Sequence, residues 1–192
     1  MRDELLAEAR TRIQQAGVSG FSYGDLASTL GIKAPSIHHH FPRKDDLVAE
    51  VAARYRAEFA EAVEAIASAE PAADAASSDR IRAYARLFAT TAAADLQCLC
   101  GAISADWVAV GEQTRAEVTG FFAEQADWLR GQLAAGVAGG EFRSDVDPAR
   151  QATLLLTALE GAIVLSRAGD RADLASRVAD DHLSLLTPTI GG

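Results

Sequence analysis

The run from Gly20 to Leu47, GFSYGDLASTLGIKAPSIHHHFPRKDDL, constrains this chain more than any other stretch. Ser22 followed by Asp25 three residues later predicts a capped helix start. Gly31 predicts the end of that helix, because glycine adopts the left-handed conformation of a C′ residue without strain. Pro35 favours the first turn of a second helix. Two short helices around a glycine turn predict a helix-turn-helix, whose second helix enters the major groove of DNA.

The second helix of this motif has one apolar face, on which Ile37, His40 and Phe41 repeat at i, i+3 and i+4. Residues off that face are expected to meet DNA, because hydroxyl, imidazole and ammonium groups can donate hydrogen bonds to phosphates or base edges. The residues predicted to bind DNA are Tyr23, Lys33, Ala34, Pro35, Ser36, His38, His39 and Lys44.

At these positions the chain resembles the amino-terminal domain of the TetR/AcrR family of bacterial transcriptional regulators. The matching residues are Asp25-Leu26-Ala27, Leu30-Gly31-Ile32-Lys33, His39-His40-Phe41, Lys44 and Leu47. Lys33 stands where this family usually has an N-cap serine or threonine. The resemblance implies an all-α fold, with an amino-terminal three-helix DNA-binding domain and a carboxy-terminal helical domain for ligand binding and dimerisation.

Charge is distributed unevenly along the chain. Residues 1–56 hold 8 Lys+Arg against 7 Asp+Glu, whereas the whole chain of 192 residues has a formal net charge of −9. DNA repels an acidic surface, so the acidic remainder is expected to lie away from it. Cations cluster at the two ends of the predicted recognition helix, at Lys33, Arg43 and Lys44, where phosphate contacts are expected.

Composition favours a cytoplasmic protein. The start, MRDELLAEAR, is charged, so it is not expected to be a secretory signal peptide. No stretch of about 18 uncharged apolar residues occurs, so no membrane span is predicted. Two cysteines are too few for a disulfide framework.

Helical periodicity continues to the end of the chain and predicts about nine helices in all. A long helix over 45–68 is expected to start in a DNA-binding domain of residues 1–46 and to end in a ligand-binding and dimerisation domain of residues 47–192, so that it can transmit a movement. A loop is predicted over 71–79, and the remaining helices are expected over 3–16, 80–94, 99–110, 114–137, 148–167 and 171–186. Gly136, Gly139 and Gly140 are expected to break the helix over 114–137.

The resemblance implies a pocket for a small-molecule effector among the middle helices, where aromatic side chains with a few polar neighbours would suit one. A packed core is the alternative for these residues. The residues predicted to bind the effector are Tyr84, Phe88, Cys98, Trp107, Phe122 and Gln125. No cofactor is expected besides this effector, whose identity the sequence does not give.

The histidines and cysteines raise two alternatives. His38, His39 and His40 are consecutive, so on a helix they point about 100° apart and cannot converge on one metal ion. Cys98 and Cys100 are interpreted as small buried apolar residues, and a thiol that senses oxidants or electrophiles is the alternative.

No sequence pattern supports catalysis, since GxGxxG, P-loop and serine-elbow motifs are absent, and the protein is not expected to be an enzyme. The run QATLLLTALEGAIVLSR is apolar nearly all round, and with the last helix it predicts a two-fold dimer through a four-helix bundle. A wholly intramolecular core is the alternative.

Together these observations predict a homodimeric repressor that binds a palindromic operator in double-stranded DNA and is released by a small-molecule inducer. The alternatives are a thiol-based redox or electrophile sensor, and a corepressor-dependent regulator or activator. A corepressor-dependent regulator and an activator differ from the inducer-released repressor only in the sign of the ligand effect, which the sequence does not encode.

Overall fold

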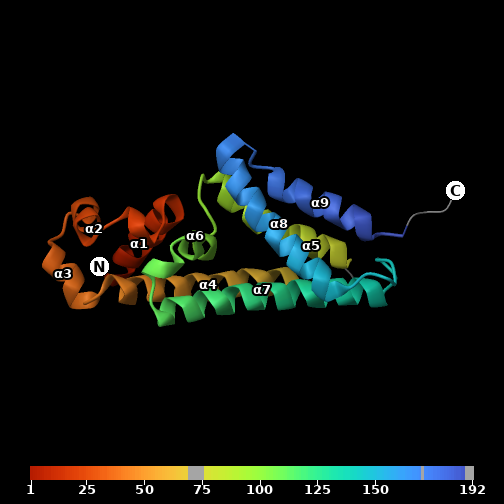
Figure 1. Cartoon of the computed structure of the whole chain (residues 1–192), viewed down its shortest axis with the longest axis horizontal. Helices are drawn as coiled ribbons and strands as arrows, with labels where there is room; N and C mark the ends of the chain where they lie inside the picture. The colour runs from red at the N-terminus through yellow and green to blue at the C-terminus, as the bar shows by residue number, and fades with distance from the viewer. Residues whose placement is uncertain (69–75, 170, 189–192) are drawn as a thin grey trace. The chain divides into compact units, whose positions relative to one another are not determined.

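The computed structural model describes residues 1–68, 76–169 and 171–188. Over these residues the chain forms nine α-helices, two short 3₁₀ helices and no strand, which confirms the predicted all-α class (Figure 1). Residues 71–75 of the predicted loop lie outside the described residues.

The chain divides into two compact units, each built from two separate segments. The first unit comprises Met1–Ala60 and Leu96–Phe122, and the second comprises Glu61–Asp95 and Ala123–Gly192. The predicted division between residues 46 and 47 stays a prediction. The segment 96–122 belongs with the amino-terminal helices, although it is far from them in sequence.

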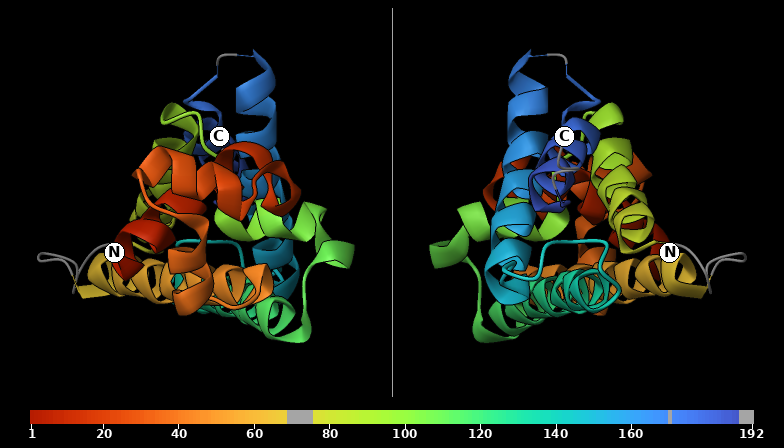
Figure 2. Two further views of the ribbon diagram at one scale, coloured as in Figure 1. Left: turned by 90° about the vertical axis from the view of Figure 1, so that its left-hand side faces the viewer. Right: turned by 90° about the vertical axis from the view of Figure 1, so that its right-hand side faces the viewer.

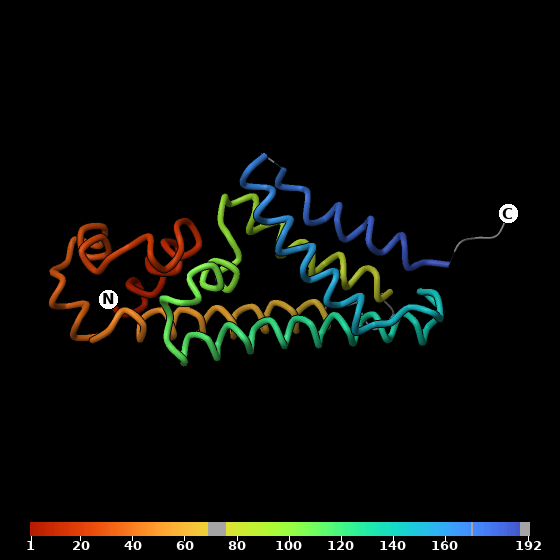
Figure 3. Tube along the Cα trace, viewed as in Figure 1, coloured from red at the N-terminus to blue at the C-terminus, as the bar shows by residue number. Residues whose placement is uncertain are grey.

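The first unit packs three short helices around the start of a long one, as the trace in Figure 3 shows. Its elements are α1 (Arg2–Ala16), η1 (Val18–Gly20), α2 (Tyr23–Leu30), α3 (Ala34–His40), the first turns of α4 (Lys44–Ser68), α6 (Leu99–Ala105), η2 (Trp107–Ala109) and the first turns of α7 (Glu112–Ala138). The α-helices of this unit bury apolar side chains, whose fully buried members include Leu5, Ile13, Leu26, Ile37, Leu47, Leu99 and Ile103.

The predicted helix over 99–110 is wrong in its second half, because α6 ends at Ala105. The carboxylate of Asp106 accepts hydrogen bonds from the amide nitrogen and the hydroxyl of Ser19, at 2.9 and 3.2 Å. This contact with η1 turns the chain, and Trp107–Ala109 then form a single 3₁₀ turn before α7.

The second unit comprises α5 (Ser77–Ala93), the rest of α7, α8 (Pro148–Gly169) and α9 (Leu174–Leu186), with α5, α8 and α9 packed pairwise. Helix α5 begins earlier than predicted, because the carboxylate of Glu141 accepts hydrogen bonds from the amides of Ser77 and Ser78 at 2.7 and 2.9 Å. Helix α7 ends at Ala138, directly before Gly139 and Gly140, as predicted, and Gly140 has a φ of 74°. Gly136 itself stays inside the helix, where the ring of Phe142 packs against it.

Helix α8 begins as predicted, with Asp147 accepting from the amides of Ala149 and Arg150 at 3.0 and 3.2 Å. By length and composition α8 could cross a membrane, but its buried face packs against α5 and α9 as a core helix does. The opposite side of α8 leaves large apolar side chains exposed, at Leu154, Val164 and Leu165.

Candidate DNA-binding site

Local signals position α2 and α3 as predicted. Ser22 and Asp25 form a reciprocal capping box at the start of α2. Gly31 ends α2 with a φ of 64°, in the left-handed region that favours glycine. The amide of Ile32 then donates to the carbonyl oxygen of Ala27 at 3.0 Å, which closes the turn. The two caps of α2 and this bond are therefore confirmed as the start and the end of the first helix of the motif.

Helix α3 is held by its apolar side and presents the other side to solvent. Ile37 is fully buried and Phe41 is 2% exposed, so both anchor α3 in the core. Lys33, Pro35, His38 and His39 are exposed, and Ala34 and Ser36 are half-buried beside them. The predicted α3 residues thus lie together along one outward-facing helix, and their contact with DNA stays a prediction.

Tyr23 is half-buried at the start of α2, where its hydroxyl donates to the carbonyl oxygen of Phe41 at 2.9 Å. Its ring meets the ring of His38 edge-on at 4.8 Å. Burial, and to a lesser extent the charge of Asp46, raises the pKa of Tyr23 to about 12. The phenol is therefore a neutral donor that joins α2 to the end of α3.

Lys44 was predicted at a phosphate, but in this structure its ammonium group contacts the protein itself. The Nζ atom donates to the carbonyl oxygens of Val18 and Phe21 and lies 4.0 Å from the centre of the Phe21 ring. Burial lowers the pKa of Lys44, and the charges of Asp106 and Asp25 act in the opposite direction. Lys44 therefore holds the segment before α2, and a phosphate contact stays a prediction.

Sequence reasoning missed the contacts that hold the motif from outside. The Asp106 carboxylate reaches Ser19 across 87 residues, and no local pattern marks this pairing. Arg43 is exposed just beyond α3, and its guanidinium is paired with Asp46 at 2.6 Å. This ion pair neutralises one of the cations expected near phosphate.

The predicted effector-binding residues divide between the two units. In the second unit, Tyr84 is fully buried, stacks on Trp128 at 5.1 Å between ring centres and contacts Phe88 at 5.3 Å. Gln125 is 2% exposed, and its Oε1 atom has no hydrogen-bond partner. These residues form a buried aromatic cluster with a polar neighbour.

Cys98, Trp107 and Phe122 belong to the first unit. Trp107 is 38% exposed on η2, with its ring beneath the guanidinium of Arg115, so the alternative of a core residue does not hold for it. Effector binding by Trp107 stays a prediction. Cys98 and Cys100 are both buried, and the hydroxyl of Tyr55 lies 3.9 Å from the Cys98 sulfur. Burial of both thiols supports their interpretation as small apolar residues.

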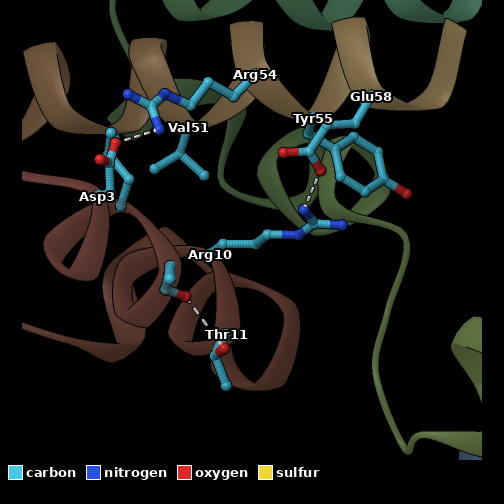
Figure 4. Close-up of a pocket in the computed structure, with 9 residues that line it drawn as sticks. Asp3, Arg10, Thr11, Val51, Arg54, Tyr55 and Glu58 are labelled. Carbon is cyan, nitrogen blue, oxygen red and sulfur yellow. Dashed lines mark hydrogen bonds and ion pairs between the residues drawn. The ribbon is translucent and has the colours of Figure 1, made fainter. Parts of the chain in front are cut away.

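A cavity of about 270 Å³ lies between α1 and α4 in the first unit (Figure 4). Its charged side chains form ion pairs, Arg54 with Asp3 at 2.7 Å and Arg10 with Glu58. These pairs leave little unbalanced charge to attract a ligand. Among the residues that the structure describes, no group of three His, Cys, Asp or Glu side chains could hold a metal ion.

Two family descriptions match the chain. Residues 5–51 match the bacterial regulatory proteins of the tetR family, and residues 77–181 match the tetracyclin repressor-like C-terminal domain. The HTH-type transcriptional repressor KstR2 of Mycolicibacterium smegmatis is 40% identical over 50 residues, which are 26% of this chain and 24% of that protein. The match therefore spans about a quarter of this relative's length.

Several solved structures have a fold similar to that of this chain over nearly its whole length. A TetR-family transcriptional regulator from Agrobacterium tumefaciens is 27% identical, with 97% of each chain covered and a TM-score of 0.89. A TetR transcriptional regulator from Legionella pneumophila is 22% identical, with 97% of each covered and a TM-score of 0.84. The reduced form of E. coli NemR is 20% identical, with 100% of this chain and 99% of the NemR chain covered and a TM-score of 0.79. The last two show the shared fold alone.

Proposed function

We propose, from the premise that this chain belongs to the TetR family of bacterial regulatory proteins, that it is a cytoplasmic repressor released from its operator by a small molecule. Members of this family are DNA-binding transcriptional regulators and not enzymes. The observation that carries the proposal is α3 itself. Its buried Ile37 anchors a helix whose exposed side bears Lys33, His38 and His39 within the matched residues 5–51.

A dimer is proposed because α8 has two apolar faces, and the residues that the structure describes cover one of them and leave large apolar side chains exposed on the other. Leu154, Val164, Leu165 and, on α9, Leu185 are 49%, 61%, 59% and 69% exposed. Ala158 and Gly161 lie on the same side of α8 as Leu154 and Leu165, and small residues there permit a close helix approach. A two-fold axis through this surface gives two recognition helices, which require a roughly palindromic operator.

The second unit suits a small-molecule effector because one face of α7 combines aromatic and amide groups. Gln125, Trp128 and Gln132 recur at i, i+3 and i+7, and the Oε1 atoms of both glutamines are buried with no hydrogen-bond partner. A buried amide oxygen without a partner is costly, so a ligand that donates a hydrogen bond would be favoured there. The stacked Tyr84 and Trp128 favour an apolar or aromatic body on the same ligand.

Release from DNA requires that the effector bind more tightly to the form that does not fit the operator. By linkage, the operator then weakens effector binding by the same factor. A corepressor or an activator reverses this sign, so a titration of operator affinity against effector distinguishes them.

A thiol-based sensor is the second candidate function, and it requires a reactive cysteine. A reactive thiolate needs exposure and a lowered pKa, whereas Cys98 and Cys100 are 3% and 0% exposed. If a thiol is the sensor, Cys98→Ser or Cys100→Ser abolishes the response to oxidants and preserves DNA binding. Burial predicts instead that both variants respond as the parent does.

The decisive experiment is selection of genomic DNA fragments by the purified protein, without added effector, near 0.15 M salt. Enrichment of one palindromic sequence supports the proposal. The same selection is carried out with the double variant Lys33→Ala/His39→Ala, which changes two exposed side chains of the motif and no buried one. This variant should lose the enrichment that the parent protein gives. Equal, salt-sensitive retention of all fragments by the parent protein would contradict a ligand-released repressor.

A further inference from the structure

Two adjacent carboxylates in the first turn of α4 serve different helices. The Asp46 carboxylate accepts from the amide of Arg43 at 3.1 Å, so it caps its own helix. The Oδ1 atom of Asp45 instead accepts from the amide of Gly111 at 2.8 Å and from the hydroxyl of Thr114 at 3.0 Å. Asp45 therefore binds the start of α7, which lies 66 residues further along the chain.

The start of α7 depends on this carboxylate. Gly111 directly precedes α7, and its carbonyl oxygen accepts the first helical hydrogen bond, from the amide of Arg115 at 3.0 Å. As a glycine it has no side chain with which to cap the helix. A Cβ atom at position 111 would lie 2.2 Å from an Asp45 oxygen, so the glycine admits the carboxylate. Thr114 is fully buried, and Asp45 satisfies its hydroxyl.

Beyond the Asp45 contact, and within the first unit, α4 and α7 run in the same direction (Figures 1 and 2). Arg56 pairs with Glu117 at 3.0 Å, and its guanidinium packs against Gly120. One turn further, Phe59 meets Phe121 edge-on at 5.1 Å between ring centres. The Asp45 contact is thus the first of a series that aligns the two helices from a common start.

The same contact lies close in sequence to the recognition helix. Helix α3 ends at His40 and α4 begins at Lys44, so Phe41–Arg43 alone separate them. The first turn of α4 therefore restrains the direction of α3, together with the buried Ile37 and Phe41. We propose that Asp45 is a positioning residue for operator recognition, which fixes α3 by fastening the start of α4 to the first turn of α7. This inference rests on the proposed function, because it assigns Asp45 a role in operator binding.

Three variants separate the possible roles of Asp45. Asp45→Ala removes both the charge and the hydrogen bonds. Asp45→Asn removes the same charge but keeps the Oδ1 acceptor that makes both bonds. Asp45→Ala/Gly111→Ser gives α7 an N-cap hydroxyl of its own, in the space that the carboxylate leaves, without joining α7 to α4. Each is measured for thermal unfolding and for affinity to the selected operator and to an unrelated duplex.

We expect Asp45→Ala to weaken operator binding about tenfold and Asp45→Asn less than about threefold, because asparagine keeps an acceptor for both bonds, although a neutral acceptor bonds more weakly than a carboxylate. The double variant should regain thermal stability but bind the operator as weakly as Asp45→Ala. Affinity for the unrelated duplex should change less than about twofold, since it depends on phosphate contacts. If Asp45→Ala does not fold, the double variant and Asp45→Asn supply the comparison.

Three results would overturn the inference: operator affinity of Asp45→Ala within twofold of the parent, equal weakness of Asp45→Asn, or recovery of operator affinity in the double variant. Recovery would mean that Asp45 acts through the stability of α7 alone. If the parent itself selects no DNA sequence, the proposed function fails and the role of Asp45 fails with it. That outcome is distinct, because it appears before any variant is compared.

Discussion

The hydroxyl of Tyr23 donates a hydrogen bond to the carbonyl oxygen of Phe41 at 2.9 Å, which joins the first residue of α2 to the residue that ends α3. The same ring contacts His38 on α3. The two helices of the motif are therefore held together by a side chain as well as by the turn at Gly31. This bond restrains the helix that is expected to read DNA.

Replacing Tyr23 by phenylalanine tests that restraint. The ring contact with His38 is kept, whereas the carbonyl oxygen of Phe41 loses its donor, so we expect the free energy of unfolding to fall by about 1 kcal/mol. Urea denaturation measures this change. An unchanged midpoint would show that water replaces the phenol without cost.

A pair of glycine substitutions separates turn geometry from helix propensity. Gly31 has a φ of 64° and open space around it, so Gly31→Ala should cost about 1 kcal/mol through backbone strain alone. Gly131 lies within α7, also with open space, and Gly131→Ala should stabilise the protein by up to about 1 kcal/mol. Urea denaturation of both variants at one protein concentration should give opposite signs, and equal signs would contradict the left-handed turn.

Lys33 is the exposed cation at the start of α3, and we expect Lys33→Ala to weaken operator binding and to reduce the slope of log affinity against log salt by about 0.9. Arg86→Ala, at an exposed position of α5, removes the same charge and serves as the control. A salt titration of fluorescence anisotropy measures both. The same slope for Lys33→Ala and the parent would exclude a phosphate contact at this position.

The exposed face of α8 predicts a dimer that a single charge can disrupt. Leu165→Glu would place two carboxylates in the proposed interface, one from each protomer, and we expect the dimer dissociation constant to rise at least about tenfold because buried unpaired charges are costly. Val108→Glu, at a position 94% exposed on η2, should leave the dimer intact. Sedimentation velocity at micromolar protein distinguishes them. A fully dimeric Leu165→Glu protein would argue for another interface.

His182 predicts how stability depends on pH. Burial lowers the pKa of His182, whereas in the unfolded chain a histidine titrates near pH 6.5, at about its ordinary value. Between these two values the unfolded state binds more protons, so the stabilising contribution is present above about pH 6.5 and is lost as the pH falls towards the folded pKa. We expect the unfolding midpoint to decrease between pH 7 and pH 5.5.

The substitution His182→Gln supplies the matched comparison, because it keeps a polar side chain in the groove of about 460 Å³ between α8 and α9. Its unfolding midpoint should depend less on pH over the same range. If the two proteins lose stability equally, titration of another group must account for the change.

Local signals predicted the motif because each acts within a few residues. Ser22 and Asp25 lie three positions apart, and the conformation of Gly31 depends on its own backbone. The cap of α8 by Asp147 is equally local. Such hydrogen bonds and backbone preferences are properties of a short peptide, so they can be read without knowing what packs against it.

The sequence by itself therefore determined the all-α class, the helix-turn-helix and the exposed side of α3, through caps, turns and apolar periodicity. Only the tertiary structure decided that Lys44 contacts Val18 and Phe21, that Glu141 caps α5, and that Asp45 fastens α4 to α7. The Glu141 and Asp45 contacts join residues more than 60 positions apart. They form only when packing of the core has brought those segments together. A carboxylate or an ammonium group can bond to any exposed amide or carbonyl, so its type and position in the sequence do not specify a distant partner.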